Sequence, residues 1–207
     1  MLPYTLPITI LLRYFKNDFL IHYPLQKMEG LYYADNYLSE HEMKNINEYL
    51  ENEKWTPITA NAKSRKVIHY GHTYAYNRSG LGEAPPIPDC LKNLVSVSRV
   101  NKFFPELKFK EMDQLIINEY KVGQGISAHI DHPKQFGPVI ICLSLGSDIE
   151  ILFSKGEVKI PVQIKMGSIY IMTGPSRYDF THSILPRKYD NKVMRKDRIS
   201  LTYRTVL

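Results

Sequence analysis

Residues 114–131 read QLIINEYKVGQGISAHID, two β-type runs joined by a glycine-rich turn and closed by a polar triplet. Gly123-Gln124-Gly125 separates the run at 114–121 from the run at 126–130, as expected for a turn between strands. Further runs of the same kind follow at 139–145, 149–153, 157–164, 168–173, 180–185 and 198–206. Eight short runs broken by glycine and proline predict a barrel or sandwich rather than alternating strands and helices.

The triplet His129-Ile130-Asp131 is a candidate metal site. Alternate residues of a strand point to the same face, so the imidazole and the carboxylate can converge on one ion. His182 lies in the run at 180–185, and a barrel can bring it opposite this pair. Two histidines and one carboxylate hold one face of an Fe(II) ion and leave positions open, as non-haem iron oxygenases require. A zinc hydrolase can use the same three side chains, which leaves a second interpretation open.

The last run places Arg198, Ser200 and Arg204 on one face. Two cations on a core strand are costly unless an anion neutralises them. An arginine binds a carboxylate through a planar fork, so a dicarboxylate such as 2-oxoglutarate fits this face. Asn118 and Tyr120 share one face of the run at 114–121 and can bond to the same ligand. Exposed arginines on an edge strand are the alternative interpretation.

The sequence before residue 111 predicts other elements. A strand is expected at 29–38, and Ser39 with Glu42 forms a capping box that predicts a helix at about 39–51. A second helix is expected at about 89–103. Residues 1–27 show no period, so we expect a mobile or surface-packed extension. One domain at 28–207 would then combine a helical support and lid region at 28–110 with a β core at 111–207.

Aromatic and basic residues alternate in the region 55–82, where a strand at 65–70 enters a hairpin. Arg65, Tyr74 and Tyr76 can contact phosphates and stack on bases. His132, beside the proposed metal site, is a further candidate for substrate contact. An edge hairpin packed on the core explains the same residues without a ligand.

Composition limits the class of protein, its partners and its compartment. The 207 residues are 43% apolar and 23% charged, which is typical of one globular domain. The net charge of +6 favours an acidic partner such as a nucleic acid. Two cysteines without CxxC spacing indicate no disulfide framework, and no apolar run is long enough to span a bilayer. We therefore expect a soluble monomer in the cytoplasm or nucleus.

These segments resemble the AlkB family of Fe(II)- and 2-oxoglutarate-dependent dioxygenases over about residues 29–207. Ser144-Leu145-Gly146-Ser147 and Gly174-Pro175-Ser176-Arg177 add to the resemblance. It implies a mainly β protein with flanking helices, a double-stranded β-helix or jelly roll, and an N-terminal hairpin that acts as a nucleotide-recognition lid. It also implies that O2 and 2-oxoglutarate are cosubstrates and assigns residues to each group: His129, Asp131 and His182 to iron, Arg198 to the far carboxylate of 2-oxoglutarate, and Asn118, Tyr120 and Arg204 to positioning it.

The resemblance also bears on the substrate. Members of this family mostly oxidise alkyl groups on nucleic-acid bases, by demethylation or by stable hydroxylation. Pro133 stands where base-repairing members often carry an acidic residue, which disfavours direct DNA repair. The segments 65–76, 174–182 and 198–204 are similar to the branch that hydroxylates modified wobble uridines in tRNA.

RNA is therefore favoured over DNA as the partner. That branch also has RNA-binding and methyltransferase domains that do not fit in this chain, so an accessory protein or the lid alone must supply binding. The alternatives are a DNA or RNA repair demethylase, a protein hydroxylase or demethylase, and a catalytically silent nucleic-acid-binding module.

Overall fold

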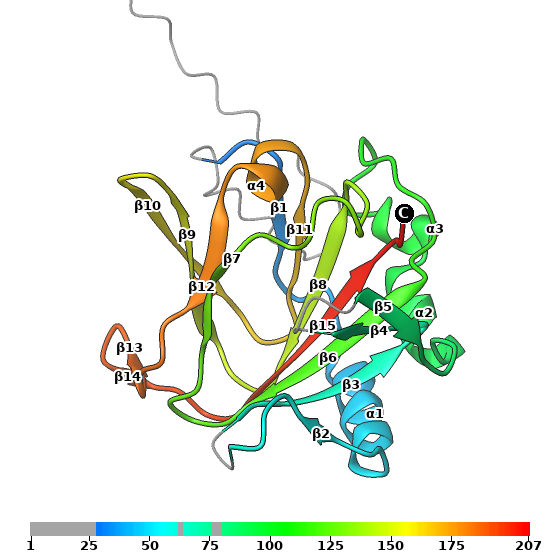
Figure 1. The fold of residues 1–207 in the computed structure, drawn as a ribbon, viewed down its shortest axis with the longest axis horizontal. Coiled ribbons are helices and arrows are strands. Elements are labelled where there is room, and N and C mark those ends of the chain that lie inside the picture. Colours follow the sequence, from blue (N-terminus) through cyan, green and yellow to red (C-terminus); the bar gives the residue numbers. More distant parts are fainter. Residues whose placement is uncertain (1–27, 62–63, 76–79) are drawn as a thin grey trace, which may run out of the picture.

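Two antiparallel sheets face each other in the structure, a computed structural model that describes residues 28–61, 64–75 and 80–207 (Figure 1). The larger sheet has the strand order β1-β11-β8-β15-β6-β3-β2, and the smaller has the order β10-β9-β12-β7. This arrangement is the expected jelly roll. The expectations for residues 1–27 and for Tyr76 lie outside the described residues.

The bounds of the strands agree with the eight predicted runs. The larger sheet contains β1 Leu31–Ala34, β2 Thr56–Pro57, β3 Lys66–Tyr70, β6 Gln114–Tyr120, β8 Ile140–Leu145, β11 Ile169–Met172 and β15 Arg198–Arg204. The smaller sheet contains β7 Ile126–His129, β9 Ile149–Lys155, β10 Val158–Ile164 and β12 Thr181–Ile184. Two separate hairpins pair β4 His72–Ala75 with β5 Gly80–Glu83, and β13 Tyr189–Asp190 with β14 Val193–Met194.

Strand β15 lies between β6 and β8, so the interpretation of its arginines as edge residues is wrong. Arg198 pairs with Tyr120 and Ser200 pairs with Asn118 across the β6 register. The polar residues of β15 line a cavity between the sheets, while Leu201 and Tyr203 belong to the core on the opposite face. The alternation in the sequence therefore predicts both faces correctly.

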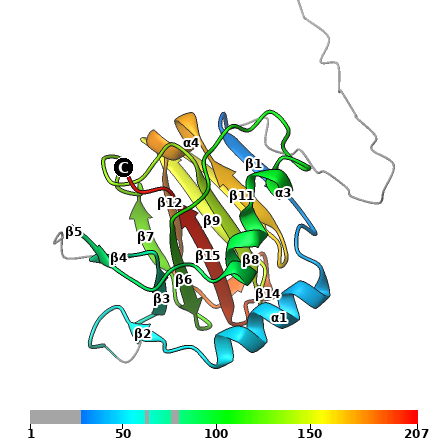
Figure 2. The ribbon, with the colours of Figure 1, turned by 90° about the vertical axis from the view of Figure 1, so that its right-hand side faces the viewer.

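Helices cover the outer face of the larger sheet, as Figure 2 shows for α1 Glu40–Glu51, α2 Asp89–Lys92 and α3 Val97–Val100. The predicted capping box is present, because Ser39 and Glu42 each bond to the backbone N–H of the other. The hydroxyl of Tyr203 donates to the carbonyl of Leu91 at 2.9 Å and ties the helical layer to β15. No helix among the described residues has the length and apolar character needed to cross a membrane.

Two predicted elements differ from the structure. The helix expected at 89–103 is three short pieces, α2, the 3₁₀ turn η1 Asn93–Val95, and α3, because Ser96 adopts an extended conformation with ψ 145°. Val95, Val97 and Val100 are β-branched, and this favours the break, since branching at Cβ lowers helix propensity. The strand expected at 29–38 is only β1, and it is followed by a turn in which Asn36 has φ 53°.

The substitution Glu42→Gln tests the contact between α1 and α3. Hydrogen bonding from Arg99 is the main cause that lowers the pKa of Glu42, to about 2 from 4.5. Solvent screening keeps the contribution small, so we expect the substitution to lower the free energy of unfolding at pH 7 by up to about 1 kcal/mol. The corresponding fall in the melting temperature is about 2–4 °C.

The stability from a carboxylate with a lowered pKa is fully present above its unfolded value and is lost as the pH falls through the folded value. The difference between wild type and Glu42→Gln should therefore vanish between pH 4.5 and about 2 in thermal melts. Glu40→Gln removes another carboxylate from the first turn and serves as the control. A difference that stays constant down to pH 2 would contradict this account.

Candidate metal centre

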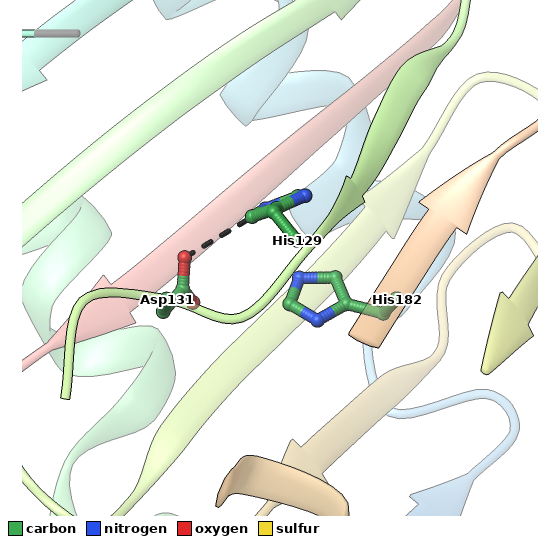
Figure 3. A group of neighbouring side chains, drawn as sticks. All are labelled: His129, Asp131 and His182. Atoms are coloured by element: carbon green, nitrogen blue, oxygen red, sulfur yellow. Dashed lines mark ion pairs between the residues drawn. The ribbon is translucent and has the colours of Figure 1, made fainter. Parts of the chain in front are cut away.

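Three predicted ligands meet between the two sheets (Figure 3). His129 ends β7, Asp131 lies on the loop that follows, and His182 lies on β12, where it pairs directly with His129 in the register. One ligand atom from each residue lies within 4.8 Å of the others, and His129 Nε2 is 3.8 Å from Asp131 Oδ1. This is the spacing of a site that a single ion can bridge.

The backbone sets the tautomer of His129. Its Nδ1 lies 2.8 Å from the carbonyl oxygen of Ser127, which can only accept a hydrogen bond. Nδ1 therefore carries the proton, and the lone pair of Nε2 points to the metal position. A carbonyl that orients a ligand imidazole in this way is common around metal ions.

The protonation states also suit a metal. Burial is the largest single effect and raises the pKa of Asp131, but the positive charges around the carboxylate, led by that of Arg204, together outweigh it and hold the pKa at about 2. Burial and the neighbouring His129 lower the pKa of His182 to about 3, because both disfavour the imidazolium. At neutral pH the site thus offers a carboxylate and a neutral imidazole, the forms that bind a cation.

Arg204 pairs with the carboxylate of Asp131. Its NH2 group lies 3.0 Å from Oδ1 and its Nε lies 3.3 Å from Oδ2. Its NH1 group donates to Gln114 Oε1 at 3.2 Å, and the guanidinium lies 4.6 Å from the ring centre of Phe136. The two arginines of β15 therefore differ, since Asp131 already supplies the anion for Arg204.

Arg198 has no such anion. It is 2% exposed, its Nε donates to Ser144 Oγ at 3.0 Å, and its guanidinium lies 5.5 Å from the ring centre of Tyr120. No carboxylate in the described part of the chain pairs with it, and its NH2 group has no hydrogen-bond partner there. A buried, unpaired guanidinium fits a carboxylate ligand, because burial without one is costly.

Nearly all predicted site residues line one cavity of about 360 Å³. The three predicted metal ligands line it together with Asn118, Tyr120, Arg65, Tyr74 and the three predicted residues of β15: Arg198, Ser200 and Arg204. His132 is exposed and does not line the cavity. The sequence interpretation missed Cys142 and Tyr170, whose place on strands β8 and β11 gave no polar signal.

Arg177 is a further residue that the sequence interpretation left without a role. It lies on α4 Gly174–Tyr178 and is 2% exposed. Its guanidinium donates to the carbonyls of Asp131 at 2.7 Å, Phe136 at 3.4 Å and Gly137 at 3.4 Å. Arg177 thus fixes the loop that carries Asp131.

Arg65 and Tyr74 line the cavity from the N-terminal part of the chain. The Nε of Arg65 donates to Asn118 Oδ1 at 3.1 Å, and its guanidinium lies 5.8 Å from the ring centre of Tyr120. The ring of Tyr74 lies 5.6 Å from that of Phe136. A cation and an aromatic ring therefore lie in the same cavity as the predicted metal ligands.

Comparison with known families agrees with this geometry. The family model of the 2OG-Fe(II) oxygenase superfamily matches residues 19–204. The chain belongs to this superfamily. Its members are dioxygenases that use Fe(II) and 2-oxoglutarate, which the cluster of His129, Asp131 and His182 and the unpaired guanidinium of Arg198 fit.

Individual relatives confirm the resemblance to AlkB proteins. The chain is 38% identical over 169 residues to the mouse (Mus musculus) tRNA (carboxymethyluridine(34)-5-O)-methyltransferase ALKBH8, a match that covers 78% of this chain and 25% of that protein. It is 38% identical over 128 residues to the uncharacterized protein L905 of Acanthamoeba polyphaga mimivirus, which covers 58% and 59% of the two chains. The chain thus spans about a quarter of the length of its mouse relative.

Solved structures share the fold. The structure of OsALKBH1 superimposes with a TM-score of 0.66 at 18% identity, over 88% of this chain and 100% of that one. A prolyl-4-hydroxylase from Pseudomonas putida gives a TM-score of 0.55 at 13% identity, over 85% and 92%. Identities this low establish the jelly roll alone.

Proposed function

We propose that this chain oxidises an alkyl group on a nucleic-acid base, with RNA, and tRNA in particular, as the favoured substrate. His129, Asp131 and His182 hold Fe(II), and Arg198 holds the far carboxylate of 2-oxoglutarate with help from Asn118, Tyr120 and Ser200. The observation that carries the proposal is the shared cavity, which joins these groups to Arg65 and Tyr74. The relative named for a uridine in tRNA supports the choice of RNA.

The bound metal and cosubstrates supply the oxidising chemistry: 2-oxoglutarate and O2 become succinate and CO2 while a C–H bond becomes C–OH. The chain's own residues position the groups that react. Arg177 and Arg204 hold Asp131 in place, and Ser127 fixes the ring of His129. Ile151, Ile184 and Met172 line the same cavity and keep its walls apolar, which limits water around the reacting groups.

Mass spectrometry of nucleosides tests the substrate. The purified protein is incubated with Fe(II), 2-oxoglutarate and ascorbate, separately with tRNA, mRNA and DNA. We expect a gain of one oxygen on a uridine derivative from tRNA. A loss of methyl groups from adenine or cytosine in DNA, with tRNA unchanged, would contradict the preference for RNA.

The substitution Tyr74→Ala tests the aromatic wall of the cavity. Stacking of a base on an aromatic ring contributes about 1–3 kcal/mol, so we expect the KM for the nucleic acid to rise about tenfold or more. Tyr189→Ala removes an exposed tyrosine from the separate β13–β14 hairpin and is the matched control. Equal KM values in the two variants would argue against a stacking role.

A repair demethylase is the second candidate. It is favoured by a relative from Arabidopsis thaliana named an alkylated DNA repair protein ALKBH8 homolog, 25% identical over 208 residues and matched over 86% of this chain and 58% of that protein. The exposed Pro133 offers no carboxylate toward a damaged base, which favours the RNA proposal. The same nucleoside analysis separates the two.

A further inference from the structure

A buried amide lies directly behind the metal carboxylate. Gln114 is the first residue of β6, is 0% exposed, and is not among the residues that line the cavity. Its Oε1 accepts from Arg204 NH1 at 3.2 Å, and Arg204 in turn holds both oxygens of Asp131. Gln114 therefore acts on the metal site through one intermediate side chain.

The other end of the same amide reaches the β4–β5 hairpin. Gln114 Nε2 donates to the backbone carbonyl of His72, the first residue of β4, at 3.4 Å. Gly71 makes this approach possible, since a Cβ there would lie 1.8 Å from the carbonyl oxygen of Asp113. The single side chain of Gln114 thus links the hairpin to the guanidinium on the metal carboxylate.

A second set of contacts joins the same partners. Tyr74 of β4 packs on Phe136, and Phe136 packs on the guanidinium of Arg204. Phe136 also lies on the loop that Arg177 fixes beside Asp131. Arg204 is therefore the point where both routes from the hairpin reach the metal site.

The hydrogen bonds of Gln114 make the position of the hairpin depend on that of Arg204. A buried amide that loses a hydrogen-bond partner still bears the cost of its desolvation. Movement of the hairpin would break the bond between Gln114 and the carbonyl of His72. Because Arg204 holds the amide in place, Gln114 cannot follow the hairpin, and the movement is unfavourable. Two elements that share such a contact are coupled, and coupling is reciprocal. An ion that fixes Asp131 and Arg204 should also steady the hairpin.

We propose that Gln114 is a positioning residue that couples the β4–β5 hairpin to the metal carboxylate through Arg204. The coupling lets the hairpin, which carries Tyr74 into the cavity, respond to an occupied metal site. This inference rests on the proposed metal site but not on the identity of the primary substrate.

Hydrogen exchange and calorimetry test the coupling with Mn(II) as the probe ion. In the unmodified protein, Mn(II) with 2-oxoglutarate should slow amide exchange in residues 72–75 about threefold or more. A slowing of this size corresponds to a modest coupling free energy between the metal site and the hairpin. In Gln114→Met, a change of similar volume that removes both hydrogen bonds, that slowing should become smaller, because only the contacts through Tyr74 and Phe136 remain. The affinity for Mn(II) should fall about three- to tenfold, below the usual effect of a direct partner of a ligand.

Tyr203→Phe is the matched control, because it removes a buried hydrogen bond from the opposite face of β15. It should lower the melting temperature yet keep the Mn(II) affinity and the response of residues 72–75. The proposal is overturned if Mn(II) binds the unmodified protein without slowing exchange there, a result that needs no variant to fold. It is also overturned if Gln114→Met behaves as the control does. Absence of Mn(II) binding by the unmodified protein would instead remove the metal site itself, and the coupling with it.

Discussion

His129→Ala is expected to weaken metal binding by at least about 100-fold, because it removes one of three side-chain ligands. The loss should be specific to the metal, since His129 is partly exposed and its removal leaves the buried pair of Asp131 and Arg204 intact. Calorimetry with Mn(II) and 2-oxoglutarate measures the affinity, and a thermal melt checks that the fold is retained.

His41→Ala is the control for this substitution. His41 lies exposed on α1, where its ring forms a hydrogen bond with Asn45, and it does not line the cavity. We expect this variant to bind Mn(II) as the wild type does. Equal affinities in His129→Ala and the wild type would remove His129 from the metal site.

Arg198→Met should separate cosubstrate binding from metal binding. A bidentate pair between an arginine and a carboxylate is among the strongest charge-assisted contacts, so we expect the affinity for 2-oxoglutarate to fall about 100-fold, or about 2.8 kcal/mol. The affinity for Mn(II) alone should stay within about twofold, because Arg198 makes no contact with the three ligands and a change below about 0.5 kcal/mol is typical of such positions.

We also expect Arg198→Met to have an unusual effect on the melting temperature. Arg198 is buried without a carboxylate partner, so replacing it by an apolar side chain of similar length should leave the melting temperature of the ligand-free protein equal or higher. Added 2-oxoglutarate should raise the melting temperature of the metal-loaded wild type by binding the native state, and it should no longer do so in Arg198→Met. Arg187→Met, outside the cavity, is the control. Unchanged stabilisation by 2-oxoglutarate in Arg198→Met would contradict the assignment.

Strand periodicity carried most of what the sequence could predict. The alternation along 198–204 placed Arg198, Ser200 and Arg204 on one face, and the structure lines the cavity with that face. The spacing of His129 and Asp131 worked for the same reason, although Asp131 lies just past the end of β7. Local pattern determines which face a side chain occupies, and here it was sufficient.

The partners across the cavity could not be predicted in the same way. Periodicity treats Arg198 and Arg204 as equivalent. In the structure, a loop carries Asp131 back toward Arg204, so Arg204 is paired with a carboxylate while Arg198 stays available for a ligand. The roles of Arg177 and Gln114 depend on hydrogen bonds to the backbone carbonyls of Asp131 and His72. The residue types in the sequence do not predict these bonds. Such contacts arise only when distant segments are folded together.

We propose that this chain uses the site formed by His129, Asp131 and His182 to oxidise 2-oxoglutarate with iron. The most direct measurement is succinate formed from 2-oxoglutarate by the purified protein in air with Fe(II), ascorbate and tRNA. We predict succinate that requires Fe(II), O2 and protein together and that falls to background in Asp131→Ala. Unconsumed 2-oxoglutarate under these conditions, or equal turnover in Asp131→Ala, would contradict the account.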